Sequence, residues 1–351
     1  MLPSDLKFGP ELENHLIENL VSDPNNPTGY FKLANFVIGN NDFTTAVGLL
    51  KKGLTLDPKN MKGLVLLAQV YTRLQAYEKS LSILNQARIL NPQHPQILFE
   101  LGLIHFKQNH WEKAKIIFQA LLKVDKNHSQ AKYLISIISK KVQGGADPNY
   151  VRDLFDNYFL QFEDHLLNGL NYQVPNIMMG EFIIPFKKKK IFSRVLDLGC
   201  GTGLSGKPLR PYCKELWGVD ISRNMLIGAK EKNIYDNLEV GEINEYLNTF
   251  PTQFDLFWAS DVMVYLGELE ELFLGIKRRS QKGAFFAFST ETLYSLNEKY
   301  QLLPSGRFCH SPSYILEVGE KFFSRLIKQK KAVLRTENQE KVMGDLYFFK
   351  V

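Results

Sequence analysis

Two glycine patterns overlap in the segment VLDLGCGTGLSG. Gly201, Gly203 and Gly206 spell G-x-G-x-x-G, which is typical of dinucleotide-binding loops. Gly199 extends the series backwards to G-x-G-x-G, with Asp197 two residues before it. Either pattern lets the backbone turn tightly and approach a ligand closely. The segment therefore predicts a loop that binds a nucleotide-like ligand, and the nearby acidic residues must decide which one.

Of the two nearby acids, only Asp197 separates the candidate ligands. Asp220, in WGVDIS, ends the next apolar segment, where a carboxylate can hold ribose hydroxyls in either case. Asp197 would repel the anionic pyrophosphate of a dinucleotide, whereas S-adenosylmethionine (SAM) brings an ammonium and a sulfonium group. We therefore interpret the segment as a SAM-binding loop and keep a dinucleotide loop as the less favoured alternative.

Ser260, Asp261 and Tyr265 follow the apolar segment Phe254 to Ala259, where a methyl acceptor is expected. Methyl transfer is an in-line displacement, and positioning can supply much of its acceleration. Asp261 could orient or deprotonate the acceptor, or it could cap the following helix. Tyr265 could line the pocket or only pack. This stretch has no N-P-P-Y or D-P-P-Y motif and no cysteine, which argues against methylation of nucleic-acid bases.

Arg307, His310 and Tyr314 cluster between two regular elements later in the chain. Arg307 could hold an acceptor carboxylate, and His310 could act as a base near neutral pH. Structural hydrogen bonding is the alternative for all three. The catalytic residues predicted from the sequence are therefore Asp261, Tyr265, Arg307 and His310.

Aromatic residues recur at helical spacing in FDNYFLQFEDHL, part of a helical lead-in over residues 148–185. The stripe of Phe155, Phe159 and Phe162 is expected to pack on the sheet. Tyr158, on the same segment, could close over the sulfonium, because a positive charge suits an aromatic face.

The elements that must position these residues alternate between short apolar strands and helical stretches from Arg194 onward. This alternation predicts a Rossmann-like α/β domain with a mostly parallel, seven-stranded sheet. The expected strands cover residues 194–198, 215–219, 237–240, 254–259, 284–289, 332–335 and 345–351.

The first half of the chain repeats with a period of 34 residues. Asp23-Pro24, Asp57-Pro58 and Asn91-Pro92 keep this spacing, and small residues recur with it at Ala34, Ala68 and Gly102. This period and these small positions resemble the tetratricopeptide repeat (TPR), a helix-turn-helix solenoid. The resemblance implies three full repeats over about 27–126, a half repeat from Glu11 to Val21 and a closing helix from Ser129 to Lys141. His105 is expected to pack within its repeat.

A glycine- and proline-containing stretch, residues 143–148, suggests the domain boundary. We expect an all-α TPR domain over 1–142 and a methyl-transfer domain over 143–351. The net charge of +6 comes from the first part, because residues 143–351 hold as many acidic as basic side chains. A concave TPR face usually binds a peptide or a partner protein, so we expect a protein partner there and no nucleic acid.

The remaining features are those of a cytoplasmic protein. Three unpaired cysteines argue against a disulfide framework and against a metal site, and they suit a reducing compartment. No signal peptide or membrane span is visible. The basic run Lys187 to Lys190 is expected to be a solvated linker, with a localisation or anion patch as the alternative.

The second half resembles the class I SAM-dependent methyltransferases, and nearly the whole chain resembles a bacterial family of predicted TPR-containing methyltransferases. The segments that carry this resemblance are FDNYFLQFEDHL, VLDLGCGTG, VDIS, FDLFWASDVMVYLGELEELF, FFAFSTE and LLPSGRFCHSPSYI. Glu242 stands where the family more often has aspartate, and Phe308-Cys309 where Tyr-Ala is usual.

The resemblance implies SAM as the cofactor, with S-adenosylhomocysteine as its product. It places Glu242 near the adenine amino group, although a solvated glutamate is the alternative. Ile221 and Met225 could sandwich the adenine, or Met225 could be plain core. The expected cofactor-binding residues are Asp197, Gly199, Cys200, Gly201, Gly203, Asp220, Ile221, Met225, Glu242, Ile243, Ser260 and Tyr158.

The sequence thus predicts a SAM-dependent methyltransferase with a TPR module that binds a protein partner or substrate. One alternative is a TPR scaffold whose SAM-binding domain is catalytically silent. A second, disfavoured by Asp197, is a dinucleotide-dependent oxidoreductase. The sequence names neither the acceptor nor the oligomeric state.

Overall fold

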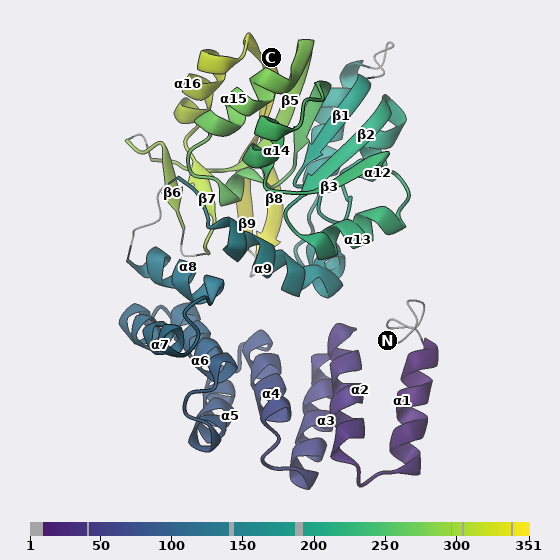
Figure 1. Cartoon of the computed structure of the whole chain (residues 1–351), viewed down its shortest axis with the longest axis vertical. Helices are drawn as coiled ribbons and strands as arrows, with labels where there is room; N and C mark the ends of the chain where they lie inside the picture. The colour runs from purple at the N-terminus through teal and green to yellow at the C-terminus, as the bar shows by residue number, and fades with distance from the viewer. Residues whose placement is uncertain are drawn as a thin grey trace. The chain divides into compact units, whose positions relative to one another are not determined.

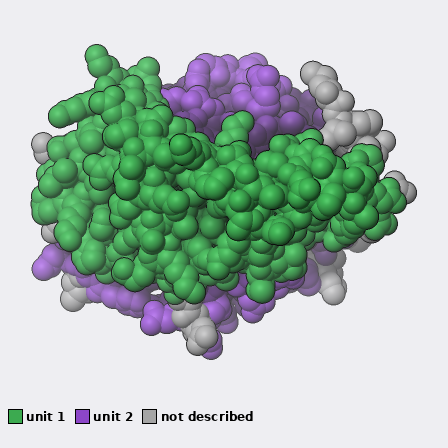
Figure 2. Space-filling view, turned by 90° about the horizontal axis from the view of Figure 1, so that it is seen from below, with its two compact units in different colours: residues 1–139 green, residues 140–351 purple. Residues whose placement is uncertain are grey.

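The computed structural model describes residues 10–40, 42–139, 144–186, 192–295, 297–303, 305–337 and 340–351. The chain divides into two units, residues 1–139 and 140–351, coloured green and purple in Figure 2. The sequence placed the boundary after residue 142, and residues 140–143 lie outside the described residues. The predicted linker run Lys187 to Lys190 also lies outside them.

The first unit is a run of eight described helices whose consecutive members pack as antiparallel pairs (Figure 1). The predicted helical repeats are therefore confirmed, and α2/α3, α4/α5 and α6/α7 form the three full repeats. The half repeat is α1, and the closing helix α8 ends at Ile138, three residues before the predicted end. The helices are α1 (Pro10–Ser22), α2 (Pro27–Gly39), α3 (Phe43–Leu56), α4 (Met61–Arg73), α5 (Tyr77–Leu90), α6 (Pro95–Lys107), α7 (Trp111–Val124) and α8 (Ser129–Ile138).

Small residues allow the helices of each repeat to approach closely. Ala34 and Ala68 are fully buried. Gly102 of α6 faces the ring of Phe118 on α7, where an added β-carbon would lie 2.4 Å from the nearest ring atom. The spacing that marks the repeat in the sequence therefore marks the helix contacts in the structure. His105 lies within α6, as expected.

The second unit is a mixed sheet in which seven strands run in the order β3-β2-β1-β4-β5-β9-β8. The strands from β3 to β5 pair in parallel, whereas β9 is antiparallel to both β5 and β8. The predicted seven-stranded fold is confirmed. The strands are β1 (Phe192–Leu198), β2 (Cys213–Asp220), β3 (Asn237–Val240), β4 (Phe254–Ala259), β5 (Ser280–Thr292), β8 (Arg325–Glu337) and β9 (Glu340–Lys350).

Two short strands were not predicted. β6 (Tyr300–Leu302) pairs antiparallel with β7 (Phe308–His310), and β7 pairs with the end of β5. The runs of apolar residues in this stretch are too short to show alternation, so it resembles a loop in the sequence. β5 supports the added strands because it extends beyond its predicted end to Thr292.

Helices cover both faces of the sheet. Neighbouring residues of a strand point to opposite sides, so they pack against different helices. On one face, Phe257 belongs to a core shared with α14 (Ile243–Thr249), α15 (Glu270–Arg279) and α16 (Pro312–Phe322). On the other face, Trp258 packs with the lead-in helices and α12. The further elements are α9 (Pro148–Tyr158), η2 (Phe159–Gln161), α10 (Phe162–Asp164), η3 (His165–Gly169), α11 (Val174–Met178), η4 (Met179–Ile183), η5 (Ile184–Phe186), α12 (Gly206–Leu209), η6 (Arg210–Tyr212), α13 (Arg223–Glu231) and η7 (Met263–Tyr265).

No helix in the part of the chain that the structure describes is long and apolar enough to cross a membrane.

Candidate active site

The glycine loop follows β1 and turns under the end of β4. Gly199 has φ +62°, and an added β-carbon there would lie 2.7 Å from a methyl group of Val262. Gly201 has φ +54°. Both conformations favour glycine, and Gly199 has no room for a side chain. The backbone N–H of Cys200 donates to Val219 O at 3.1 Å, which holds the loop against β2.

Asp220 ends β2 and faces this loop. One carboxylate oxygen accepts the N–H of Gly201 and the other that of Ser222, each at 2.8 Å. Burial raises the pKa of Asp220 to about 6, although the two backbone hydrogen bonds oppose this rise. Because each carboxylate oxygen has two lone-pair sites, both oxygens can accept one more donor from the cavity.

Asp197 does not lie where the sequence analysis expected it. Its side chain is 1% exposed, and Tyr235 donates a hydroxyl hydrogen bond to Oδ2 at 2.6 Å. Burial raises its pKa to about 7. Asp197 does not line the cavity described below, so it supports the loop from beneath instead of facing a cationic ligand group.

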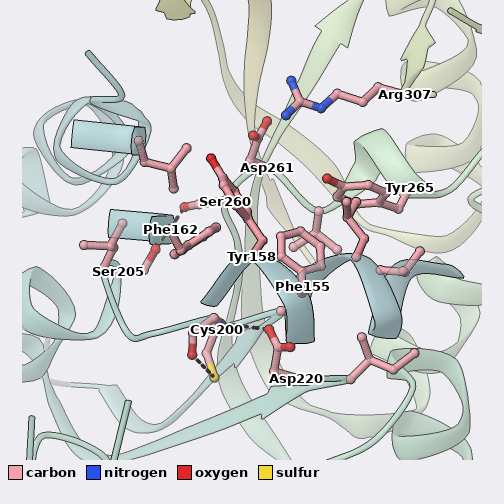
Figure 3. A pocket seen from close by; sticks show the side chains of 18 of the residues that line it. Phe155, Tyr158, Phe162, Cys200, Ser205, Asp220, Ser260, Asp261, Tyr265 and Arg307 are labelled. Carbon is pink, nitrogen blue, oxygen red and sulfur yellow. Dashed lines mark hydrogen bonds between the residues drawn. The ribbon is translucent and has the colours of Figure 1, made fainter. Parts of the chain in front are cut away.

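The described part of the second unit encloses a cavity of about 430 Å³ at the carboxyl ends of β1, β2 and β4 (Figure 3). This is the size range of small-ligand pockets, about 300–1,000 Å³. Twelve of the predicted site residues line it: Tyr158, Gly199, Cys200, Gly201, Asp220, Ile221, Glu242, Ile243, Ser260, Asp261, Tyr265 and Arg307. Four do not: Asp197, Gly203, Met225 and His310.

Met225 and His310 are core residues. Met225 is fully buried in α13, which agrees with the packing alternative. His310 is fully buried on β7 and contacts the carbonyl oxygen of Gly267 through Nε2 at 3.2 Å. Burial lowers its pKa to about 4, which leaves it neutral at physiological pH. The prediction that His310 acts as a base is therefore wrong, and its side chain makes a structural hydrogen bond instead. Tyr314 is structural too, since its hydroxyl accepts the N–H of Leu269 at 2.9 Å.

Glu242 lines the cavity and also begins a helix. Its Oε2 atom accepts the N–H of Glu245 at 2.9 Å and so caps α14. The sequence suggested either an adenine contact or a solvated side chain for Glu242, and neither prediction included this helix cap. The cap fixes the carboxylate at the cavity edge, beside Ile243.

Aromatic side chains of the lead-in cover the cavity. Phe155, Tyr158 and Phe162 line it. Phe162 also packs against the core of the sheet, as the sequence predicted for the stripe. Phe155 makes an edge contact with Tyr265, with ring centroids 5.4 Å apart. The Tyr158 hydroxyl hydrogen-bonds Nδ1 of His165, which also lines the cavity.

A polar contact anchors this aromatic cover to the ligand-binding end. Ser222, which caps α13, donates its hydroxyl to Asp156 on α9 at 2.6 Å. Asn224 adds a bond from its side-chain amide to the Asp156 carbonyl at 3.0 Å. The turn that follows Asp220 therefore also positions α9, the helix that carries Asp156.

Ser260 and Asp261 follow β4 and form the far end of the cavity (Figure 3). Ser260 Oγ receives the indole N–H of Trp258 at 2.8 Å. Asp261 has φ +61°, a conformation that costs energy for a residue with a side chain. Its backbone N–H donates to Ser289 Oγ at 2.8 Å, which stabilises that turn. η7 has no side-chain cap, so Asp261 is not the helix cap that the sequence allowed.

Arg307 lines the cavity but is already paired. Its Nη1 atom lies 2.7 Å from Glu337, and 22% of its side chain is exposed. Glu337 lines the cavity as well. No sequence signal pointed to Glu337, because it comes from the far end of β8 and meets Arg307 only through the sheet order. Tyr172, between η3 and α11 of the lead-in, also lines the cavity without having been singled out from the sequence. Glu291 stands inside the quoted segment FFAFSTE.

No group of three or more histidine, cysteine, aspartate or glutamate side chains that could hold a metal ion occurs among the described residues. The described cysteines, Cys200, Cys213 and Cys309, are all buried and free.

Comparison with known families agrees with this architecture. Residues 196–288 match the model of a methyltransferase domain. Residues 75–138 match a tetratricopeptide repeat model, and residues 15–87 match the model of anaphase-promoting complex, cyclosome, subunit 3. The second unit is a class I SAM-dependent methyltransferase domain. The chain as a whole joins an N-terminal TPR region to this domain.

Curated relatives match parts of the chain. An uncharacterized methyltransferase of Schizosaccharomyces pombe is 27% identical over 143 residues, covering 35% of this chain and 50% of that protein. A malonyl-[acyl-carrier protein] O-methyltransferase of Buchnera aphidicola is 27% identical over 138 residues, covering 38% and 56%. The chain spans about half the length of these curated relatives.

Solved methyltransferase structures are similar to part of the chain. A SAM-dependent methyltransferase from Clostridium acetobutylicum has 17% identity and a TM-score of 0.43, covering 56% of this chain and 98% of that one. Magnesium protoporphyrin IX methyltransferase from Synechocystis, solved with bound S-adenosylhomocysteine, has 14% identity and a TM-score of 0.44, covering 58% and 98%.

Proposed function

We propose that this protein binds SAM in the cavity of its second unit and transfers the methyl group to an acceptor at the Ser260–Asp261 end. The observation that carries the proposal is Asp220. Its carboxylate is held by two backbone donors, keeps acceptor capacity, and borders the same cavity as the glycine loop. A vicinal diol is the ligand group that suits such a carboxylate.

The residues present fit SAM as the ligand. Asp220 would hold the ribose hydroxyls, Glu242 and Ile243 would border the adenine, and the loop at Gly199 and Gly201 would approach the methionine portion. Gly199 has no β-carbon where one would clash with Val262, so the loop can pack closely against the segment after β4. When bound, SAM supplies a methyl group carried on a positively charged sulfur.

The protein's own residues would then position the acceptor and exclude water. The rings of Phe155, Tyr158 and Phe162 cover the cavity and keep it apolar. Asp261 and Tyr265 would orient the acceptor from the end of β4. Proximity and orientation are sufficient to account for much of the acceleration of such a displacement.

Calorimetric titration with SAM tests the proposal. We expect saturable binding by the full chain, and weaker binding by Asp220→Ala, because hydrogen bonds to a charged group contribute about 1.5–3 kcal/mol each. The loss should therefore be at least tenfold. Glu320→Ala, an exposed carboxylate on α16, is the control and should bind as the wild type does. Binding of NADH in preference to SAM would instead favour the oxidoreductase alternative.

We also propose that the TPR region presents a protein substrate or partner. A groove of about 1690 Å³ lies along α1, α2 and α4 and carries both apolar and polar side chains, including Leu16, Lys32, Asn35 and Gln69. Introducing Asn35→Arg should block an occupant of this groove. We expect it to reduce methylation of protein acceptors, and the matched variant Asn85→Arg on α5, outside the groove, to leave it unchanged.

A further inference from the structure

Five charged side chains meet at the acceptor end of the cavity. Asp261 follows β4, Glu291 lies on β5, Arg307 precedes β7, and Arg335 and Glu337 lie on β8. Asp261, Arg307 and Glu337 line the cavity, whereas Arg335 and Glu291 are buried behind them. The group contains three carboxylates and two guanidinium groups.

Both guanidinium groups are committed to the two glutamates. Arg335 reaches Glu337 through Nε at 2.6 Å and Glu291 through Nη2 at 2.5 Å. Arg307 reaches Glu337 at 2.7 Å. Burial raises the pKa of Glu291 although Arg335 opposes the rise, whereas at Glu337 burial is outweighed by the two arginines, which lower the pKa. An acceptor carboxylate that approached Arg307 would also meet the carboxylate of Glu337, which lines the same cavity and pairs with Arg307 Nη1.

Asp261 is the carboxylate left over. Its Oδ1 atom lies 3.6 Å from Arg335 Nη1, too far for a hydrogen bond. Both of these buried atoms are without a hydrogen-bond partner among the described residues. Figure 3 shows the Asp261 side chain reaching into the space between Tyr158 and Arg307. Since 16% of the side chain remains exposed, a cavity ligand can reach this carboxylate.

The five side chains therefore carry one formal negative charge in excess beside the aromatic wall of the cavity. A buried carboxylate oxygen without a hydrogen bond is costly, and a positively charged or N–H-bearing ligand would relieve that cost. The surrounding rings of Phe155, Tyr158 and Tyr265 add aromatic faces, which also attract cations.

We propose that the methyl acceptor is an amine nitrogen held by Asp261, and not a carboxylate held by Arg307. This inference rests on the proposed function and names the substrate class of the same site. An ammonium ligand first releases one proton to solvent, since only the neutral amine has a free lone pair. That lone pair forms the new N–C bond while the S–C bond breaks, and the electron pair of the broken bond returns to sulfur. The positive charge passes from sulfur to nitrogen, beside Asp261, and the amine protons stay on the nitrogen.

Matched small probes test this preference in the full chain saturated with S-adenosylhomocysteine. The probes are phenethylamine, which is cationic at pH 7, phenylacetate and neutral 2-phenylethanol, and their binding is measured by ligand-observed NMR. We expect phenethylamine to bind at least tenfold more tightly than phenylacetate. Asp261→Asn should remove most of that preference. Asp153→Asn, a half-buried site on α9 that does not line the cavity, should retain it.

The outcomes separate this inference from the proposed function. If S-adenosylhomocysteine binds but phenylacetate binds as tightly as phenethylamine, the amine inference is overturned and the proposed function stands. An unchanged preference in Asp261→Asn, with its cofactor affinity and unfolding temperature intact, also overturns it. If the wild type binds neither SAM nor S-adenosylhomocysteine, the proposed function fails and the inference falls with it. The wild-type comparison remains decisive even if the variant fails to fold.

Discussion

The buried acid Asp197 makes the stability of the second unit depend on pH. Its pKa is raised from an ordinary value of 3.8 to about 7 because burial disfavours its charged form. Between these two values the folded state binds a proton that the unfolded state has released. The free energy of unfolding must therefore fall as the pH rises, until Asp197 ionises in the folded state as well.

The size of the effect follows from the pKa. One pKa unit corresponds to about 1.4 kcal/mol. Between pH 6 and pH 8, a group with a folded pKa of about 7 is on average half protonated in the folded state. Over these two pH units it therefore removes about 1.4 kcal/mol from the free energy of unfolding. Asp197→Asn abolishes this contribution and keeps an acceptor for the Tyr235 hydroxyl. We expect the stability of the wild type to fall by about 1.4 kcal/mol more than that of the variant over this interval.

Urea unfolding followed by tryptophan fluorescence measures this difference. The chain has three tryptophans, and Trp217 and Trp258 lie in the second unit. A Trp111→Phe background therefore limits the signal to that unit. Tyr235→Phe is the informative companion: it removes a bond that lowers the pKa of Asp197, so its pH dependence should persist and move to higher pH. Parallel stability curves for the wild type and Asp197→Asn from pH 6 to pH 8 would refute the reasoning.

Two further substitutions probe packing and buried charge. Gly102→Ala should lower the unfolding temperature of the TPR unit, measured by circular dichroism. A β-carbon 2.4 Å from the Phe118 ring forces a repacking that costs about 1–3 kcal/mol. An unchanged transition would contradict the close contact. Arg335→Met should destabilise the second unit by about 3–5 kcal/mol, because it leaves Glu291 buried without its cation. The matched variant Arg325→Met, at an exposed position on the same strand, should change the urea midpoint little, and equal losses in both would argue against the ion pair as the cause.

The ligand-binding half of the cavity was predictable because its signals are local. A glycine with positive φ and a carboxylate at a strand end are set by a few neighbouring residues, so Gly199, Gly201 and Asp220 were identified from the sequence. Asp197 was also identified as an unusual residue. Its role was not, because its partner Tyr235 lies 38 residues away and is brought beneath the loop only by the sheet.

The acceptor half was predicted less well because its contacts join distant strands. The sequence singled out Asp261 and Arg307, but the pairing of Arg307 with Glu337 depends on β8 lying next to β9 and β9 next to β5. His310 illustrates the opposite error. It stood in an apparent loop, and the short strand β7 buried it against Gly267.

By itself, the sequence determined the repeat period, the order of strands and helices and the loop that borders the cavity, because periodicity and turn chemistry act between near neighbours. Only the tertiary structure decided which charges are paired. Arg307, which the sequence offered as a free cation, is paired with Glu337, Arg335 is paired with Glu291, and Asp261 is left facing the cavity. Electrostatic partnership depends on distances of a few ångströms in space, and the chain sets those distances only once the sheet is assembled.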